Sequence, residues 1–283
     1  MISSLPKKKQ DELKYLGYTK IGSLYSESLS ELKKQTKHLL SEAKANNPNA
    51  QKLFNLINAN LSLKQRSNAI VDEFLVSRLK QILDEKEVDI YPVSHILKPF
   101  GKKSAIWHQD SSVVDESKHF SLNAWSSLVN SNKLNGCLWV FPGSHINTNY
   151  YRQFGYVSIV DYIKNIKHYL VPIYAKAGEI VLFHRNLIHG SGMNFLPFPR
   201  VAVEALITPC GAQLYNFHRD DKLEKGKLMG FEVPPEHFLK ASPKEDFYSG
   251  EFSYDLYTSL SKSEIVAKLK SEMPKFIAHA SKV

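Results

Sequence analysis

Apolar residues recur at helical spacing through most of residues 1–87. Leu29, Leu32 and Leu39 follow a possible capping box that runs from Ser28 to Glu31. A second short apolar face covers residues 53–57, and a longer stripe covers residues 70–83. Because polar residues fall between the apolar ones, this part of the chain is predicted to form amphipathic helices that pack on a larger core.

The pattern changes at Val88. From there the apolar runs are short, rich in β-branched and aromatic residues, and separated by turn residues such as Asn135-Gly136 and Pro142-Gly143. The predicted strands cover residues 89–97, 121–129, 138–141, 169–174, 179–183 and 201–208. Many short strands at regular spacing are typical of a β-sandwich or barrel, here with helices packed outside. After Pro209 the pattern weakens, and residues 263–270 resemble a short helix.

Composition narrows the class of protein but not its chemistry. With 43% hydrophobic and 23% charged residues, the 283-residue chain is neither disordered nor collagen-like, and its two cysteines cannot form a disulfide framework. No stretch is long and apolar enough for a membrane span, and no signal peptide is visible, so we expect a cytoplasmic protein. The net charge of +9 favours anionic partners, but the lysines are scattered, which favours a solvated surface over a nucleic-acid patch.

Candidate metal ligands come from the spacing of histidine and aspartate. In Trp107-His108-Gln109-Asp110 the imidazole of His108 and the carboxylate of Asp110 would project from the same face of a strand, while Gln109 points away. A surface histidine with a nearby aspartate is the commoner meaning of this short motif. A second imidazole must come from elsewhere, and His184 and His189 are candidates at the end of an apolar strand.

Arg200 opens the next predicted strand, eleven residues after His189. The planar guanidinium suits a carboxylate held at two points. Arg200 would therefore either bind an anionic ligand or pair with Glu204 or another carboxylate of the sheet.

Taken in order, these motifs resemble the phytanoyl-CoA dioxygenase (PhyH) family of iron(II)- and 2-oxoglutarate-dependent oxygenases. The resemblance covers about residues 98–208 and extends weakly to residues 16–21. It rests on Trp107-His108-Gln109-Asp110, Asn123-Ala124-Trp125, the run from Asn135 to His145, and His189-Gly190-Ser191-Gly192-Met193-Asn194 followed by Arg200. It implies a mainly β fold, a double-stranded β-helix (jelly-roll, cupin-like) core with N-terminal helices packed outside. One domain over residues 1–283 is expected, with a mainly helical part (1–87), a metal-binding core (88–210) and a C-terminal extension (211–283).

The resemblance also implies roles for individual residues. His108, Asp110 and His189 match the three ligands of iron(II), which leave open positions for a 2-oxo acid and for O2. Arg200 matches the residue that binds the distal carboxylate of 2-oxoglutarate, and Ser191, Trp125 and Lys98 match other positions near that cosubstrate. His184 is expected to support the site or the fold. His145 follows a Pro-Gly turn that should form an exposed corner, so it is expected to be structural.

The implied activity is oxidation of a small-molecule substrate, most simply its hydroxylation, with conversion of 2-oxoglutarate to succinate and CO2. A carboxylate at Asp110 argues against the related halogenating enzymes, which lack this ligand. Two alternatives stay open: a non-catalytic cupin-like metal or small-molecule binding protein, and an oxygenase that acts on nucleic acid or protein. The positive charge and Arg152 favour an anionic or zwitterionic substrate, and residues 146–168 are either a lid over the substrate pocket or a plain surface excursion.

Overall fold

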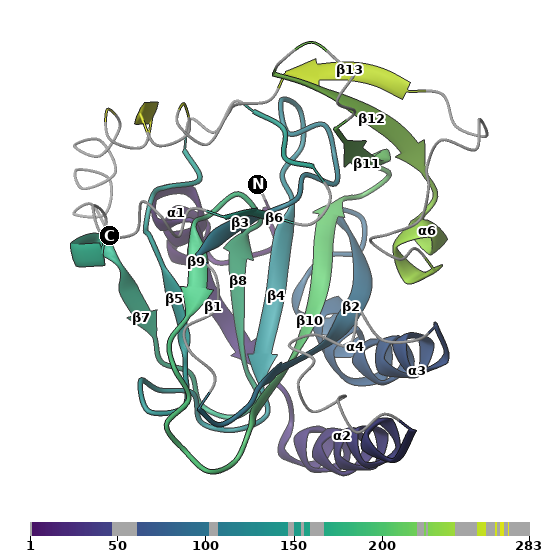
Figure 1. Cartoon of the computed structure of the whole chain (residues 1–283), viewed down its shortest axis with the longest axis vertical. Coiled ribbons are helices and arrows are strands. Elements are labelled where there is room, and N and C mark those ends of the chain that lie inside the picture. Colours follow the sequence, from purple (N-terminus) through teal and green to yellow (C-terminus); the bar gives the residue numbers. More distant parts are fainter. Residues whose placement is uncertain are drawn as a thin grey trace.

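The computed structural model describes most of the chain through residue 240 and a short strand beyond it. The described residues are 2–46, 61–101, 107–146, 150–153, 156–158, 167–219, 224, 226–240 and 254–258, together with 264, 267–268 and 271. Two five-stranded antiparallel sheets form the body of the molecule (Figure 1). This is a double-stranded β-helix, as the family resemblance implies.

The first sheet has the strand order β1-β8-β4-β10-β2. Its strands are β1 (Tyr18–Ser23), β8 (Glu179–His184), β4 (Leu122–Ser127), β10 (Arg200–Pro209) and β2 (Val88–Lys98). The second sheet has the order β6-β3-β9-β5-β7. Its strands are β6 (Tyr156–Ser158), β3 (His108–Asp110), β9 (His189–Ser191), β5 (Leu138–Val140) and β7 (Val171–Ile173).

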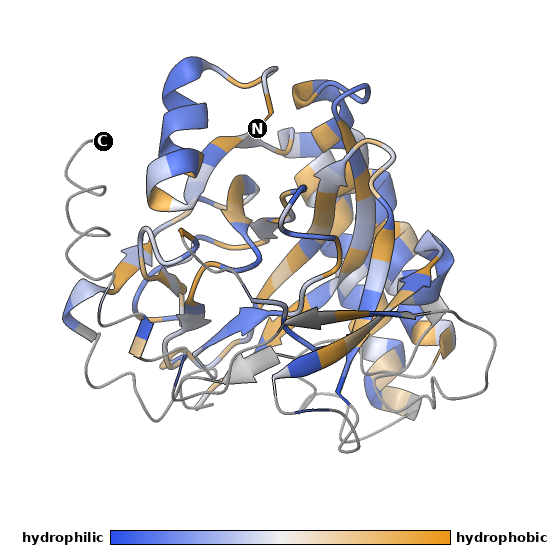
Figure 2. Cartoon of the chain, turned by 90° about the horizontal axis from the view of Figure 1, so that it is seen from above, coloured by the Kyte–Doolittle hydropathy of each residue, from blue (hydrophilic) through white to orange (hydrophobic). Residues whose placement is uncertain are grey.

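An apolar layer joins the two sheets. It contains Trp125, Phe183 and Ala202 from the first sheet and Leu138 and Ile173 from the second. Figure 2 shows hydrophobic and hydrophilic residues alternating along several strands, as expected when one face of a sheet is buried. The inward face of the first sheet therefore looks across this layer at the second sheet.

Helices cover the outer face of the first sheet. They are α1 (Lys7–Leu16), α2 (Ser26–Asn46), α3 (Leu61–Val71) and α4 (Ser77–Ile82), with a π-helical turn (Asp72–Val76) between the last two. Val71, Leu75 and Leu79 belong to the same buried cluster as Val203 and Ile207 of β10. The stripe predicted over residues 70–83 thus faces the sheet, as its spacing requires.

The sequence patterns locate the main strands well and the ends of the chain less well. All six predicted strands overlap strands of the structure, including β7 and the long β2 and β10. The N-terminal part contains a strand that was not predicted, because β1 pairs with β8 at the edge of the first sheet. Helix α2 begins at Ser26, before the predicted capping box. Residues 53–57 lie outside the described residues, and so do most of residues 263–270.

A third, smaller sheet follows the core. It consists of β11 (Leu214–His218), β12 (Lys227–Val233) and β13 (Tyr254–Thr258), and α6 (Pro235–Lys240) follows β12. Leu214, Met229 and Phe231 pack with Val113 and with Leu206 of β10 in one buried cluster. No helix in the described part of the chain is both long and apolar enough to cross a membrane.

Candidate active site

Three potential metal ligands meet where β3 and β9 pair. His108 lies directly opposite His189 in the antiparallel ladder, and their ring centroids are 4.3 Å apart. Asp110 lies two residues along β3 on the same face as His108. One ligand atom from each of the three side chains lies within 4.8 Å of the other two, and no other such group occurs among the described residues. This spacing suits a single metal ion.

The carboxylate of Asp110 is held in place from the first sheet. Asn123 Nδ2 donates a hydrogen bond to Asp110 Oδ2 at 2.5 Å, and Arg185 Nη1 lies 4.0 Å from the same oxygen. Burial alone would raise the pKa of Asp110. The positive charge of Arg185 and the neighbouring histidines outweigh burial and hold this pKa well below its usual range. The group is therefore an ionised carboxylate, the form that binds a cation.

His189 is held in the form that ligates a metal. Its Nδ1 lies 2.9 Å from the carbonyl oxygen of Leu187, which can only accept, so Nδ1–H is the donor and the lone pair is on Nε2. Nε2 is the atom that lies 3.8 Å from Asp110 Oδ2. Burial, with a smaller effect of His108, lowers the pKa of His189 to about 4. The imidazole is therefore neutral at pH 7.

Buried polar contacts hold the face of β3 that points away from the metal ligands. Gln109 points away from the ligands and donates from Nε2 to the carbonyl oxygen of Asn186 at 2.5 Å, while the hydroxyl of Tyr150 donates to Gln109 Oε1. Arg152 donates from Nε to the carbonyl oxygen of Asp110 at 2.5 Å and pairs with Glu116 at 2.6 Å. Tyr150 and Arg152 are only 3% and 1% exposed. Tyr150 and Arg152 pack behind β3 and do not line the cavity, so the lid interpretation is wrong for these two residues. Residues 147–149, 154–155 and 159–166 of that segment lie outside the described residues.

Arg200 is a buried cation without a counter-ion in the described part of the chain. Its side chain starts at the beginning of β10, is 2% exposed, and stacks over Trp125 with 5.3 Å from Cζ to the ring centroid. Nε donates to the carbonyl oxygen of Gly136 at 3.1 Å, but the buried Nη1 has no hydrogen-bond partner there. Burial lowers the pKa of Arg200 to about 10. No ion pair joins Arg200 to Glu204 within the described residues, so the pairing alternative receives no support, and an external carboxylate fits this position.

The other predicted cosubstrate residues gather at the same place. Lys98 lies opposite Arg200 in the β2–β10 ladder, is fully buried, and donates from Nζ to Ser191 Oγ at 3.2 Å. A cavity of about 110 Å³ lies between the sheets. Its lining includes His108, Asp110, His189, Trp125, Ser191 and Arg200. The structure thus brings together all seven residues that the sequence analysis selected.

A comparison with protein families identifies the chain. The sequence profile of the phytanoyl-CoA dioxygenase (PhyH) family matches residues 16–202. The chain belongs to the PhyH family. The cavity residues His108, Asp110, His189, Trp125, Ser191 and Arg200 all fall within the matched range.

Individual relatives match this PhyH-family chain over shorter stretches. Phytanoyl-CoA dioxygenase 1 of Oryza sativa subsp. japonica is 33% identical over 104 residues, which are 34% of this chain and 36% of that protein. Ectoine dioxygenase of Streptomyces coelicolor is 29% identical over 150 residues, or 46% of this chain and 50% of that protein. The chain spans half or less of the length of the curated relatives it matches.

A solved relative supports the fold. The crystal structure of EctD from S. alaskensis with 2-oxoglutarate and 5-hydroxyectoine superimposes with a TM-score of 0.55 at 22% identity, covering 86% of each chain. At this identity the likeness concerns the fold.

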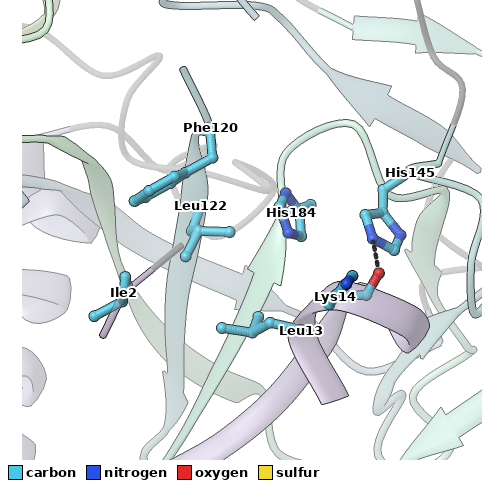
Figure 3. A pocket seen from close by; sticks show the side chains of 7 residues that line it. All are labelled: Ile2, Leu13, Lys14, Phe120, Leu122, His145 and His184. Carbon is cyan, nitrogen blue, oxygen red and sulfur yellow. Dashed lines mark hydrogen bonds between the residues drawn. The ribbon is translucent and has the colours of Figure 1, made fainter. Parts of the chain in front are cut away.

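His145 and His184 lie outside the metal-ligand group. Their rings stack with centroids 4.6 Å apart, and His145 Nε2 lies 3.2 Å from the carbonyl oxygen of Lys14 in α1. Figure 3 shows both imidazoles in a separate cavity of about 260 Å³, whose lining includes Leu13 and Phe120. The turn before His145 is buried, so the expected exposed corner is wrong. Its Gly143 N–H donates to the carbonyl oxygen of Leu16, which ties this turn to the end of α1.

Three residues of the site were not selected from the sequence. Asn123 was quoted only as part of a motif, although its alternation with Trp125 places both on the inward face of β4. Arg185 follows β8 directly, and Glu204 stands on the inward face of β10 with Arg200. Strand alternation could have selected Asn123 and Glu204. Nothing in the local sequence indicates that Arg185 approaches Asp110.

Proposed function

We propose that this PhyH-family protein is an iron(II)- and 2-oxoglutarate-dependent dioxygenase that hydroxylates a small molecule, with release of succinate and CO2. The observation that carries the proposal is the unpartnered Nη1 of buried Arg200 beside a cavity that also contains a His-Asp-His ligand group. Isolating a cation from water is costly, so such a group is retained where a ligand completes it. The names of the phytanoyl-CoA and ectoine dioxygenase relatives agree with this activity.

Each residue of the cavity has a distinct task in this proposal. His108, Asp110 and His189 would hold iron(II) on one side, and a two-histidine, one-carboxylate set leaves positions for a 2-oxo acid and O2. When bound, iron(II) supplies the redox chemistry that couples decarboxylation of the 2-oxo acid to oxidation of the substrate. Asn123 keeps one oxygen of Asp110 in place, and the carbonyl of Leu187 keeps Nε2 of His189 directed at the metal.

Arg200, Ser191 and Lys98 form the proposed anion-binding group, here called the anion cradle. Arg200 would bind the distal carboxylate of 2-oxoglutarate with two parallel hydrogen bonds, and Ser191 would add a hydroxyl. Lys98 contributes a further positive charge and positions Ser191 through its 3.2 Å hydrogen bond. Trp125 forms an apolar wall beneath the guanidinium and helps to exclude water.

The proposed substrate is a small molecule that is hydroxylated. A small molecule fits a cavity between two sheets, and hydroxylation fits the presence of Asp110 as a carboxylate ligand. An anionic or zwitterionic substrate was predicted partly from Arg152, but that residue is paired with Glu116 behind β3. The net charge of +9 is the support that remains for this preference. A single domain over residues 1–283 and a cytoplasmic location stay predictions.

The proposed function is tested by cosubstrate binding in the absence of oxygen. Iron(II) and 2-oxoglutarate added to the anaerobic wild-type protein should produce the metal-to-ligand charge-transfer band of a chelated 2-oxo acid. His189→Ala should lose this band, whereas His168→Ala, at an exposed histidine, should keep it. With air, wild type should form succinate in the presence of a pooled metabolite library. A wild-type protein that binds iron(II) but develops no band would contradict the proposal.

A further inference from the structure

Glu204 brings a carboxylate to the cavity that neither the metal nor the cosubstrate requires. It lies on β10 and lines the same cavity as the ligand group and Arg200. In the ladder with β4 it stands directly opposite Trp125, whose side chain faces the cavity. Opposite residues of an antiparallel pair share a face, so Glu204 projects between the two sheets.

Glu204 lies outside the set of metal ligands. The group of atoms within 4.8 Å of one another contains His108, Asp110 and His189 but not Glu204. The four-residue step from Arg200 to Glu204 is about 13 Å along an extended strand. The charges that act most on Glu204 are those of Asp110, Arg185 and His108, and Arg200 is not among them. Glu204 therefore faces the metal end of the cavity and not the anion cradle.

No salt bridge joins Glu204 to a cation in the described part of the chain. Arg185, whose charge acts on Glu204, donates instead from Nη1 to Asn123 Oδ1 at 2.6 Å and from Nε to the carbonyl oxygen of Ser111 at 3.2 Å. The carboxyl group of Glu204 therefore meets the cavity itself, where a ligand can reach it.

We propose that Glu204 anchors a positively charged nitrogen of the substrate, so that the substrate class is an ammonium or guanidinium compound, zwitterions included. This inference rests on the proposed function, because it treats the cavity as the place where a substrate meets the metal. The carboxylate accepts a charge-assisted hydrogen bond from the cationic group and holds the rest of the molecule beside the ligand group. In this proposal Glu204 positions the substrate and does not transfer a proton.

The overall charge of +9 does not conflict with a cationic substrate. Exposed charges more than about 8–10 Å away are largely screened at physiological ionic strength, whereas a charge inside the cavity is screened much less. The lysines that dominate the net charge are scattered along the chain. The charge of Glu204 decides what is held at the metal, and the surface charge affects only the approach.

Matched pairs of small probes test the proposal. The protein is loaded with zinc(II), which is redox-inert and diamagnetic, together with 2-oxoglutarate, so that binding is read without turnover. The probes are methylguanidinium against methylurea and propylammonium against propanol, which differ in charge but little in size. Ligand-observed NMR titrations give their affinities, and calorimetry gives the affinity for 2-oxoglutarate in the same samples.

Wild type should bind each cation at least about tenfold more tightly than its neutral partner, in line with a hydrogen bond to a charged group. Glu204→Gln should abolish this preference, and Glu204→Asp should retain part of it. Glu85→Gln removes the same charge at an exposed position and should change nothing. Affinity for 2-oxoglutarate should stay within about twofold in all four proteins, because Glu204 lies apart from the anion cradle.

The possible failures are distinct. A wild type without preference for cations, or a preference that survives in Glu204→Gln, overturns the role of Glu204 while 2-oxoglutarate binding stays intact. A wild type that does not bind 2-oxoglutarate with the metal overturns the proposed function, and with it the substrate class inferred here. A Glu204→Gln protein that loses affinity for 2-oxoglutarate as well would place Glu204 in the cosubstrate site and also overturn the proposal.

Discussion

Replacing Arg200 by Met separates a ligand-binding cation from a structural one, because the two roles predict opposite effects on stability. Burial lowers the pKa of Arg200 from 12.5 to about 10. That difference corresponds to about 3 kcal/mol by which the pocket without a carboxylate disfavours the charged form. Met preserves most of the length and apolar contact of the side chain and removes the charge.

The gain in stability is partly offset by lost contacts. The hydrogen bond from Nε to Gly136 and the contact with Trp125 are each worth about 1 kcal/mol. Without cosubstrate, Arg200→Met should therefore be more stable than wild type by about 1 kcal/mol, which raises the melting temperature by about 2–4 °C.

The effect on cosubstrate binding has the opposite sign. A charge-assisted bidentate pair lost from a buried site costs about 2–5 kcal/mol, or about thirty- to several-thousand-fold in affinity for 2-oxoglutarate. Arg200→Lys should recover part of this affinity, since a point charge cannot make two parallel hydrogen bonds. Thermal melts with and without metal and 2-oxoglutarate measure both effects, and Arg219→Met, at an exposed arginine, is the matched control. A variant that melts several degrees lower than wild type yet keeps its affinity for 2-oxoglutarate would refute the reasoning.

Three further predictions concern the supports of the site and of the sheet. Asn123→Leu removes the donor to Asp110 and should weaken metal binding about 10- to 100-fold in a metal titration; an unchanged affinity would exclude this support. His95 is buried with its pKa lowered from 6.5 to about 4 by burial, so the unfolded state binds more protons between these values and stability falls as the pH drops. Between pH 7 and pH 5, urea unfolding should show that the free energy of unfolding falls by about 2 kcal/mol more in wild type than in His95→Gln. Equal losses in the two proteins would contradict the lowered pKa of His95. Gly136→Ala should lower the melting temperature far more than Gly211→Ala. Both glycines have positive φ, but an added Cβ meets a backbone oxygen at 2.7 Å at Gly136 and nothing within 4 Å at Gly211. Equal destabilisation would show that only the φ angle matters.

The sequence predicts those helices and strands whose apolar residues recur at regular spacing within one segment. The long apolar strands β2 and β10 and the helical stripe over residues 70–83 have their pattern within one segment. Strand β1 was missed because its edge position leaves Gly22 and Ser23 exposed, which weakens the alternation. The third sheet was missed because its strands are separated by long connections and bury only part of their surface against Val113 and Leu206.

The residues of the site also fall into those that a local pattern or motif predicts and those that only the packing of the sheets brings together. The position of His108 and Asp110 on one face follows from alternation within a strand, and the family motif supplies His189 and Arg200. The approach of Asn123 and Arg185 to Asp110 depends on how β3 of one sheet sits over β4 and β8 of the other. The buried role of Arg152 likewise depends on a contact with Glu116 across 36 positions of sequence. Contacts of this kind arise from sheet packing, which no local pattern encodes.

If the proposed function holds, the packing of the two sheets also determines which dicarboxylate fits the site. The ligand group belongs to β3 and β9 of one sheet, whereas Arg200 and Lys98 belong to β10 and β2 of the other. Stacked sheets lie about 10 Å apart, and the apolar layer of Leu138, Ile173 and Phe183 maintains that spacing beside the cavity. A dicarboxylate would span from the metal to the guanidinium, so its length has to match the gap that this layer sets between the two sheets. Thinning this layer should therefore weaken 2-oxoglutarate more than the metal, because the metal needs one sheet and the diacid needs both.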